Sequence, residues 1–133
     1  MQLAPATIAR LLANARRAQA NAHAPYSGFR VGAAVLAADG RVFQGCNVEN
    51  ASFGLTVCAE RNAVAAAVVA GARPVAVAIV TPGDHVGPCG ACRQVLAEFD
   101  LDMPVVLADR NGDHPVATAL RELLPGAFRF KEP

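Results

Sequence analysis

The chain is built around two short segments, Val57-Cys-Ala-Glu-Arg61 and Gly87-Pro-Cys-Gly-Ala-Cys-Arg-Gln94. They hold three of its four cysteines, and a carboxylic acid, Glu60, stands two residues after the first of these. Three thiolates leave one position of a tetrahedral zinc ion open for water, which is the usual arrangement of catalytic zinc. A nearby carboxylate can then move protons. We therefore predict one zinc ion per chain, with three ligands: Cys58, Cys89 and Cys92.

Helix signals follow both segments. The alanine-rich run 63–70 favours helix and stops at Gly71. Pro88 is expected near the first position of a second helix that continues through 93–99. Two helix N-termini therefore supply all three sulfurs, and their dipoles offset part of the excess negative charge of three thiolates. Arg61 is the side chain best placed to add a full positive charge.

The cysteines have two other interpretations. A Cys-Gly-Ala-Cys sequence alone fits a redox pair, but this leaves the first cysteine and Glu60 without a role. A structural zinc site would use Cys46 as a fourth thiolate, because closed sites are commonly all-cysteine. Cys46 stands at the end of a predicted strand, where a free cysteine more often serves as a small buried apolar residue. A non-catalytic interaction module stabilised by zinc stays open as an alternative.

Composition limits the class of protein. With 133 residues, of which 53% are hydrophobic, the chain is expected to form one α/β domain over 1–133. The net charge of +1 gives no general attraction to nucleic acid, so a small-molecule substrate is favoured. Free thiolates indicate a reducing, cytoplasmic compartment. No apolar run is long enough to span a membrane, so no membrane partner is expected.

The first four strands follow from turn and connection signals. Strands are predicted over 31–37 and 42–45, joined by a hairpin at Asp39-Gly40, a pair that tolerates positive φ. Two more strands, over 75–80 and 105–108, flank the second zinc helix. A strand, helix, strand unit of this kind makes its two strands parallel, with a right-handed crossover.

The two ends of the chain complete the predicted fold. Apolar residues at helical spacing predict an amphipathic helix over 5–21. Near the other end, 109–114 is too short for a parallel crossover, so a fifth strand around Val116 should run antiparallel to the fourth. A short helix over 118–124 is then expected to end at Pro125.

A glutamate beside three zinc-binding cysteines is a signature of zinc nucleobase deaminases. With Asn47-Val-Glu-Asn-Ala51 added, the chain resembles cytidine deaminases of the small homotetrameric type. The resemblance extends from Pro25-Tyr-Ser-Gly-Phe29 to Leu123-Leu-Pro-Gly-Ala-Phe128. It implies a three-layer α/β/α cytidine deaminase-like fold, with a mixed five-stranded sheet, an N-terminal β-hairpin and an antiparallel last strand. It also implies a pyrimidine nucleoside substrate and a homotetramer with shared active sites.

The resemblance implies an activity, namely hydrolytic deamination of cytidine and 2′-deoxycytidine to uridine and 2′-deoxyuridine with release of ammonia, a step of pyrimidine salvage. Zinc makes hydroxide available near neutral pH for attack on C4. Glu60 matches the proton shuttle of the family, and it would serve ring N3 and then the departing amine. Arg61 matches the arginine that neutralises thiolate charge.

The resemblance also assigns substrate contacts. Asn47 and Glu49 match a pair that hydrogen-bonds the ribose 3′-hydroxyl, although a turn residue and a surface acid are the plain alternatives. Phe29 matches an aromatic that packs on the pyrimidine, and the backbone N–H of Ala59 would meet the 2-oxo group. Phe128 matches a residue that enters a neighbouring subunit's pocket. Both phenylalanines have ordinary packing roles as alternatives.

One residue departs from the family pattern. Phe53 stands where relatives commonly carry tyrosine near the 5′-hydroxyl, so one polar contact is expected to be lost while the zinc chemistry is unaffected. The main rival within the enzyme class is a deaminase of an aminated nucleoside antibiotic such as blasticidin S. The presence of Phe29, Gln94 and Phe128 favours cytidine.

Overall fold

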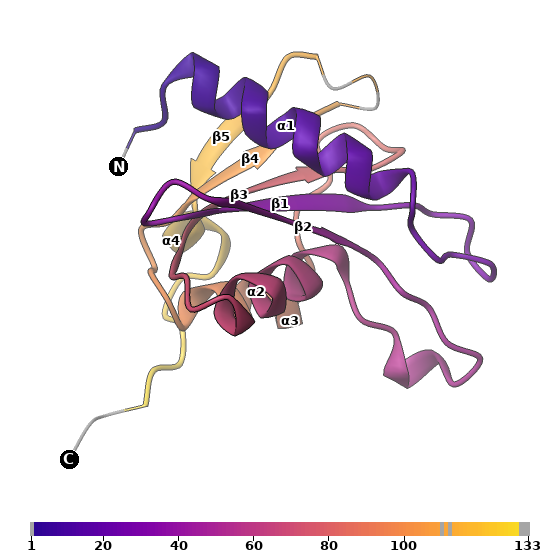
Figure 1. The fold of residues 1–133 in the computed structure, drawn as a ribbon. Helices are drawn as coiled ribbons and strands as arrows, with labels where there is room; N and C mark the ends of the chain where they lie inside the picture. Colours follow the sequence, from indigo (N-terminus) through magenta and orange to yellow (C-terminus); the bar gives the residue numbers. More distant parts are fainter. Residues whose placement is uncertain (1, 110, 112, 131–133) are drawn as a thin grey trace.

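The predicted N-terminal hairpin forms one edge of a five-stranded sheet (Figure 1). In the computed structural model, which describes residues 2–109, 111 and 113–130, β1 (Gly32–Ala37) and β2 (Val42–Cys46) pair antiparallel. Gly40 has a φ of 91° at the turn, a conformation that glycine adopts without steric cost. The Asp-Gly signal therefore identified this hairpin correctly.

The remaining strands extend the sheet in the order β2-β1-β3-β4-β5. β3 (Pro74–Val80) runs antiparallel to β1 and parallel to β4 (Pro104–Leu107). β5 (Val116–Ala119) runs antiparallel to β4, as the short connection predicted. The mixed sheet with an antiparallel last strand is confirmed.

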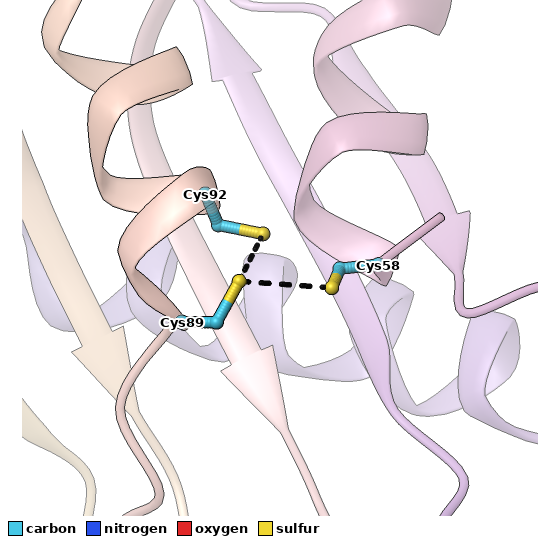
Figure 2. A group of neighbouring side chains, drawn as sticks. All are labelled: Cys58, Cys89 and Cys92. Atoms are coloured by element: carbon cyan, nitrogen blue, oxygen red, sulfur yellow. Dashed lines mark hydrogen bonds between the residues drawn. The ribbon is translucent and has the colours of Figure 1, made fainter. Parts of the chain in front are cut away.

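Helices cover both faces of the sheet and make three layers (Figure 1). α1 (Pro5–Gln19) packs on one face, while α2 (Ala59–Val69) and α3 (Gly90–Ala97) pack on the other. Figure 2 shows cysteines at the starts of both α2 and α3, where the two helices lie close together. The core between the sheet and the α2–α3 layer includes small alanines and larger residues: Ala33, Val35, Ala63, Ala67, Val77, Leu96, Met103 and Val105.

Two glycines let the helices approach the sheet backbone closely. A Cβ atom on Gly32 would lie 1.9 Å from the carbonyl oxygen of Ala15 in α1. On the opposite face, a Cβ on Gly45 would lie 2.3 Å from Ala59 O and 2.4 Å from Ala63 N in α2. Side-chain atoms do not approach backbone this closely, so α2 occupies its position only because residue 45 has no side chain.

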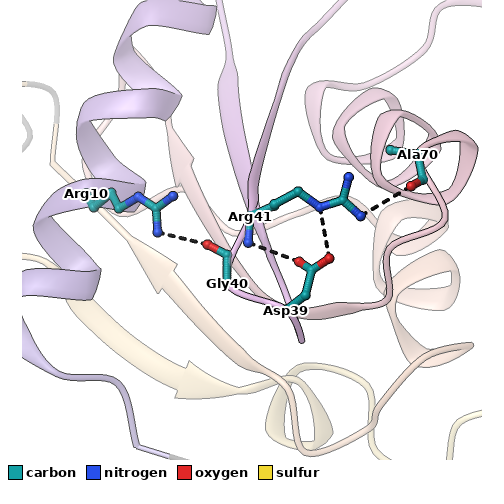
Figure 3. A network of polar contacts seen from close by, with 5 residues as sticks. All are labelled: Arg10, Asp39, Gly40, Arg41 and Ala70. Carbon is teal, nitrogen blue, oxygen red and sulfur yellow. Dashed lines mark hydrogen bonds and ion pairs between the residues drawn. The ribbon is translucent and has the colours of Figure 1, made fainter.

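A polar network at the hairpin turn links all three layers (Figure 3). Arg41 pairs with Asp39 at 2.9 Å and donates to the carbonyl oxygen of Ala70, just after α2, at 3.2 Å. From the other layer, Arg10 of α1 donates to Gly40 O at 2.9 Å. The turn is thereby attached to α1 on one side and to the C-terminal end of α2 on the other.

Some predicted boundaries were wrong by a few residues. Pro88 lies outside α3, which begins at Gly90 and has Cys89 as its N-cap. The helix expected over 118–124 is reduced to α4 (Leu120–Leu123), because its first two residues pair with β4.

Two further features concern the helices. A short 3-10 helix, η1 (Phe53–Leu55), was not predicted. No helix in the described part of the chain has the length and apolar character needed to cross a bilayer.

Candidate zinc and substrate site

The three predicted zinc ligands lie together at the starts of α2 and α3 (Figure 2). Cys58 is the N-cap of α2, Cys89 is the N-cap of α3, and Cys92 lies in the first turn of α3. Their sulfur atoms all lie within 4.8 Å of one another. Cys46 is not a member of this group, and the described residues therefore give no support to a four-cysteine structural site.

The spacing of the sulfurs fits a zinc ion. A tetrahedral ion with Zn–S bonds of about 2.3 Å places neighbouring sulfurs about 3.8 Å apart. The Sγ atoms of Cys58 and Cys89 are 3.8 Å apart, and those of Cys89 and Cys92 are 3.4 Å apart. All four cysteines are free thiols, so these ligands are not used in disulfides. Three soft donors with an open fourth side match zinc in a catalytic arrangement.

Charge around the sulfurs also favours a cation. A hydrogen bond from the Cys92 thiol, together with the nearby Arg61 guanidinium, lowers the pKa of Cys58 to about 5. The same hydrogen bond and burial raise the pKa of Cys92. A divalent ion bound by these cysteines would stabilise their thiolate forms.

Arg61 lies beside this group, as the sequence predicted. Its Nη2 atom is 3.5 Å from Cys58 Sγ and 3.5 Å from the carbonyl oxygen of Thr56. Donation to Cys58 raises the pKa of Arg61. Its Nε atom is buried without a hydrogen-bond partner among the described residues. The guanidinium therefore places a full positive charge next to the sulfurs.

Glu60 is buried in the first turn of α2, with 4% of its surface exposed. Burial raises the pKa of its carboxyl, and the Cys58 thiolate raises it further. A carboxyl with a raised pKa exchanges protons more readily near neutral pH than an ordinary glutamate does. The protein thus places a buried carboxyl with a raised pKa beside the sulfur group.

Cys58, Glu60 and Cys89 line a cavity of about 360 Å³, which is large enough for a small organic molecule, whereas Cys92 and Arg61 do not line it. Buried polar residues gather there: Asn47, Glu60 and Thr81, the three buried polar side chains of the described chain, all line it. A larger hollow of about 780 Å³ lies against α1, but its walls contain no cysteine. The predicted site residues at the smaller cavity are Phe29, Asn47, Glu49, Cys58, Ala59, Glu60 and Cys89.

Asn47 is bonded to the loop before β1. Its side chain accepts a hydrogen bond from Val31 N–H at 2.9 Å and donates to Phe29 O at 2.8 Å. This pair of contacts fixes both its amide orientation and the loop that carries Phe29.

Glu49 contacts the same loop closer to its start, at Tyr26 and Ser27. Its carboxylate accepts hydrogen bonds from Tyr26 N–H at 2.9 Å, Ser27 N–H at 3.2 Å and the Ser27 hydroxyl. The hydroxyl contact lowers the pKa of Glu49, which stays ionised. Asn47 and Glu49 therefore position the 26–31 loop as well as facing the cavity.

Two predicted residues lie elsewhere. Phe128 is 72% exposed and does not line this cavity, and its carbonyl oxygen accepts a hydrogen bond from Gln94. Phe53 is 71% exposed and packs edge-on against the Tyr26 ring, with centroids 5.5 Å apart. Neither residue contributes to the cavity within one copy of the chain.

Sequence reasoning did not assign several residues that line the cavity. Ser27 lies within the Pro-Tyr-Ser-Gly-Phe segment that carries the family resemblance, so its hydroxyl is the one lining group that the sequence could have indicated. The remaining residues depend on how loops approach one another, which the sequence pattern does not show. The unassigned lining residues are Ser27, Val31, Thr56, Ile79, Thr81, Val86 and Gly87.

Comparisons with known proteins agree with this geometry. The family described as the cytidine and deoxycytidylate deaminase zinc-binding region matches residues 5–108. The chain is 48% identical to a cytidine deaminase of Sporosarcina psychrophila, covering 91% of this chain and 90% of the relative. It is 50% identical to a cytidine deaminase of Halalkalibacterium halodurans, covering 92% and 94%.

Solved structures show the same likeness. A cytidine deaminase from Burkholderia pseudomallei matches with a TM-score of 0.85 and 47% identity, over 90% of this chain and 98% of that one. A cytidine deaminase from Mycobacterium tuberculosis matches with a TM-score of 0.78 and 46% identity, over 92% and 97%.

Proposed function

The chain belongs to the cytidine and deoxycytidylate deaminase family, and on that basis we propose that it is a zinc-dependent cytidine deaminase. It would hydrolyse cytidine and 2′-deoxycytidine to uridine and 2′-deoxyuridine, releasing ammonia. One observation carries the proposal: two of the three grouped cysteines, Cys58 and Cys89, and the buried Glu60 line a nucleoside-sized cavity, with the third sulfur directly behind them. This activity belongs to pyrimidine salvage.

The chemistry divides between the metal and the chain. Zinc held by the three cysteines supplies, when bound, an activated water for attack on ring C4. Glu60 takes a proton from the attacking water and delivers it to ring N3. The same carboxyl then takes the remaining proton of the hydroxyl added at C4 and passes it to the departing amine, which leaves as ammonia, and its raised pKa suits both transfers. Arg61 and the two helix N-termini offset the thiolate charge.

Substrate contacts follow from the cavity lining. Asn47 and Glu49 are proposed to hydrogen-bond the ribose 3′-hydroxyl, which would join the contacts they already make to the 26–31 loop. Phe29 is proposed to pack on the pyrimidine. The backbone N–H of Ala59, at the first position of α2, has no partner within the helix and would donate to the 2-oxo group.

We further propose a homotetramer with shared active sites. Support comes from large apolar side chains that one copy leaves exposed, among them Phe53, Val69, Phe128 and Phe130. Phe128 is proposed to reach a neighbouring subunit's cavity. Light scattering coupled to size exclusion would measure the assembly, and a monomer that is fully active would exclude shared sites.

Two general properties of the chain, its domain organisation and its location in the cell, are also proposed. Residues 1–133 are proposed to form a single cytidine deaminase-like domain, supported by one sheet with helices on both faces. A cytoplasmic location is proposed because free zinc-binding thiols suit a reducing compartment.

The test is deamination of cytidine by zinc-loaded protein, followed as loss of ultraviolet absorbance. We expect Glu60→Gln to retain one zinc per chain and lose nearly all turnover. A Glu60→Gln protein as active as wild type would exclude Glu60 as the proton carrier. Blasticidin S assayed beside cytidine separates the two substrate classes, and cytidine is the expected substrate.

A further inference from the structure

The loop that joins β3 to α3 forms part of the cavity wall. It carries Thr81, Val86, Gly87 and Cys89, and all four line the cavity. Residues 81–89 contain no helix or strand. The position of this wall therefore depends on individual contacts between the loop and its neighbours.

His85 makes two such contacts from an uncommon backbone conformation. Its φ is 51°, and His85 and His114 are the two non-glycine residues with positive φ in the described chain. The His85 backbone N–H donates to Ala108 O at 3.3 Å. Its ring Nε2 lies 2.8 Å from His114 O, and because a carbonyl oxygen only accepts, Nε2 must donate.

These contacts tie the loop to the end of β4 and to the connection that follows it. Ala108 comes directly after β4, is 1% exposed, and donates its own N–H to Ile79 O at 3.3 Å. Ile79 also lines the cavity. The backbone of His85 is thus anchored to a buried segment, while its ring reaches the β4–β5 connection.

The residue after His85 shows what this anchoring does. Val86 lines the cavity, and its Cγ2 atom lies only 2.8 Å from where a Cβ on Gly83 would be. The chain therefore folds back on itself at 83–86, and the positive φ of His85 lies within that reversal. A strained backbone conformation persists only where surrounding contacts hold it.

We propose that His85 is a positioning residue that holds Val86 and Gly87 in the wall of the substrate cavity, through its left-handed backbone and its ring contact with His114. The proposal rests on the proposed deaminase function. His85 itself does not line the cavity, so it acts through its neighbours. Loosening the wall weakens ground-state and transition-state binding alike, which raises KM and leaves kcat nearly unchanged.

Four variants distinguish the effect of the positive backbone φ from the effect of the ring hydrogen bond. His85→Ala loses the ring donor and disfavours positive φ. His85→Gly permits that φ but lacks the donor, whereas His85→Asn tolerates it and keeps a shorter N–H donor. His114→Asn is the matched control, because it keeps the carbonyl oxygen and tolerates its own φ of 47°.

Steady-state kinetics with cytidine should rank the variants. One hydrogen bond of ordinary strength corresponds to about a five-fold change in KM, so we expect at least that for His85→Ala. His85→Gly and His85→Asn should fall between it and wild type, with kcat within about two-fold throughout. His114→Asn should match wild type. Combining His85→Ala with Val86→Ala should raise KM less than the product of the two single effects.

Amide hydrogen exchange tests the wall without activity. Exchange at the hydrogen-bonded N–H groups of residue 85 and Ala108 should be faster in His85→Ala and His85→Gly than in wild type or His114→Asn. If wild-type protein does not turn over cytidine, the deaminase proposal fails, and exchange still tests the wall. Unchanged KM and unchanged exchange in His85→Ala would overturn the proposal, as would a loss in kcat alone.

Discussion

Gly45→Ala is predicted to displace the helix that carries the first zinc ligand. The new Cβ would lie 2.3 Å from Ala59 O and 2.4 Å from Ala63 N. Ordinary contacts of this kind are about 1 Å longer, so α2 must move by roughly that distance, because both opposing atoms are backbone and cannot rotate away. Overpacking at a well-packed site costs about 1–3 kcal/mol, and we expect the upper end here.

The displacement should reach the chemistry, because Cys58 and Glu60 both lie at the start of the shifted helix. A misplacement of about 1 Å in a catalytic group is expected to lower activity by about 100-fold. We therefore expect weaker zinc retention against a chelator and a large loss of kcat/KM. Gly54→Ala is the matched control, since nothing lies within 4 Å of a Cβ at that position.

Denaturant unfolding of the zinc-loaded proteins, zinc content and cytidine turnover together measure these effects. Gly45→Ala protein with wild-type stability, zinc content and turnover would show that the contact between β2 and α2 does not set the position of the site.

Further predictions concern the metal and the turn. Cys58→Ser should lose zinc while Cys46→Ser keeps one ion per chain, as measured by metal analysis; zinc loss in the second variant would revive the structural-site interpretation. Zinc affinity should fall as pH is lowered from about 8 to about 6, because the pKa of Cys92 is raised and its thiol must release a proton to bind metal. Competition with a chelator across this pH range measures the affinity. A zinc affinity that does not change with pH would contradict the predicted proton release. Arg41→Ala should leave the midpoint of denaturant unfolding close to that of wild type, since the ion pair between Arg41 and Asp39 is half-exposed; a large shift of the midpoint would mean that the turn network stabilises the fold more than exposed pairs usually do.

Features with a local cause could be predicted from the sequence. Asp39-Gly40 specified the hairpin because the turn needs a positive φ at its second residue, which Gly40 adopts without steric cost. The length of each connection specified which strands run parallel, and the grouping of the three cysteines followed from two predicted helix starts. In each case, the residues that carry the signal lie next to the structure that they specify.

Features that depend on contacts between segments far apart in the sequence could not be predicted. Nothing in the local sequence shows that Gly45 lies against α2, or that the Glu49 carboxylate holds the 26–27 backbone. The start of α3 was misplaced because Pro88 fits the first helical position on local grounds, while the N-cap is Cys89. Val86 and His85 acquire their roles only once the β3–α3 loop meets the β4–β5 connection.

The proposed zinc ligands come from the starts of two helices that are separated by a strand in the chain and lie together on one face of the sheet. An ion bound to both is also a crosslink within the helical layer, and it closes a loop of chain between Cys58 and Cys89. Because zinc binding then adds to the stability of the folded chain, the amount of folded protein depends on the zinc available. Loss of the ion would remove this link between α2 and α3 while leaving their buried contacts with the sheet, so zinc-free protein is expected to unfold at a lower denaturant concentration.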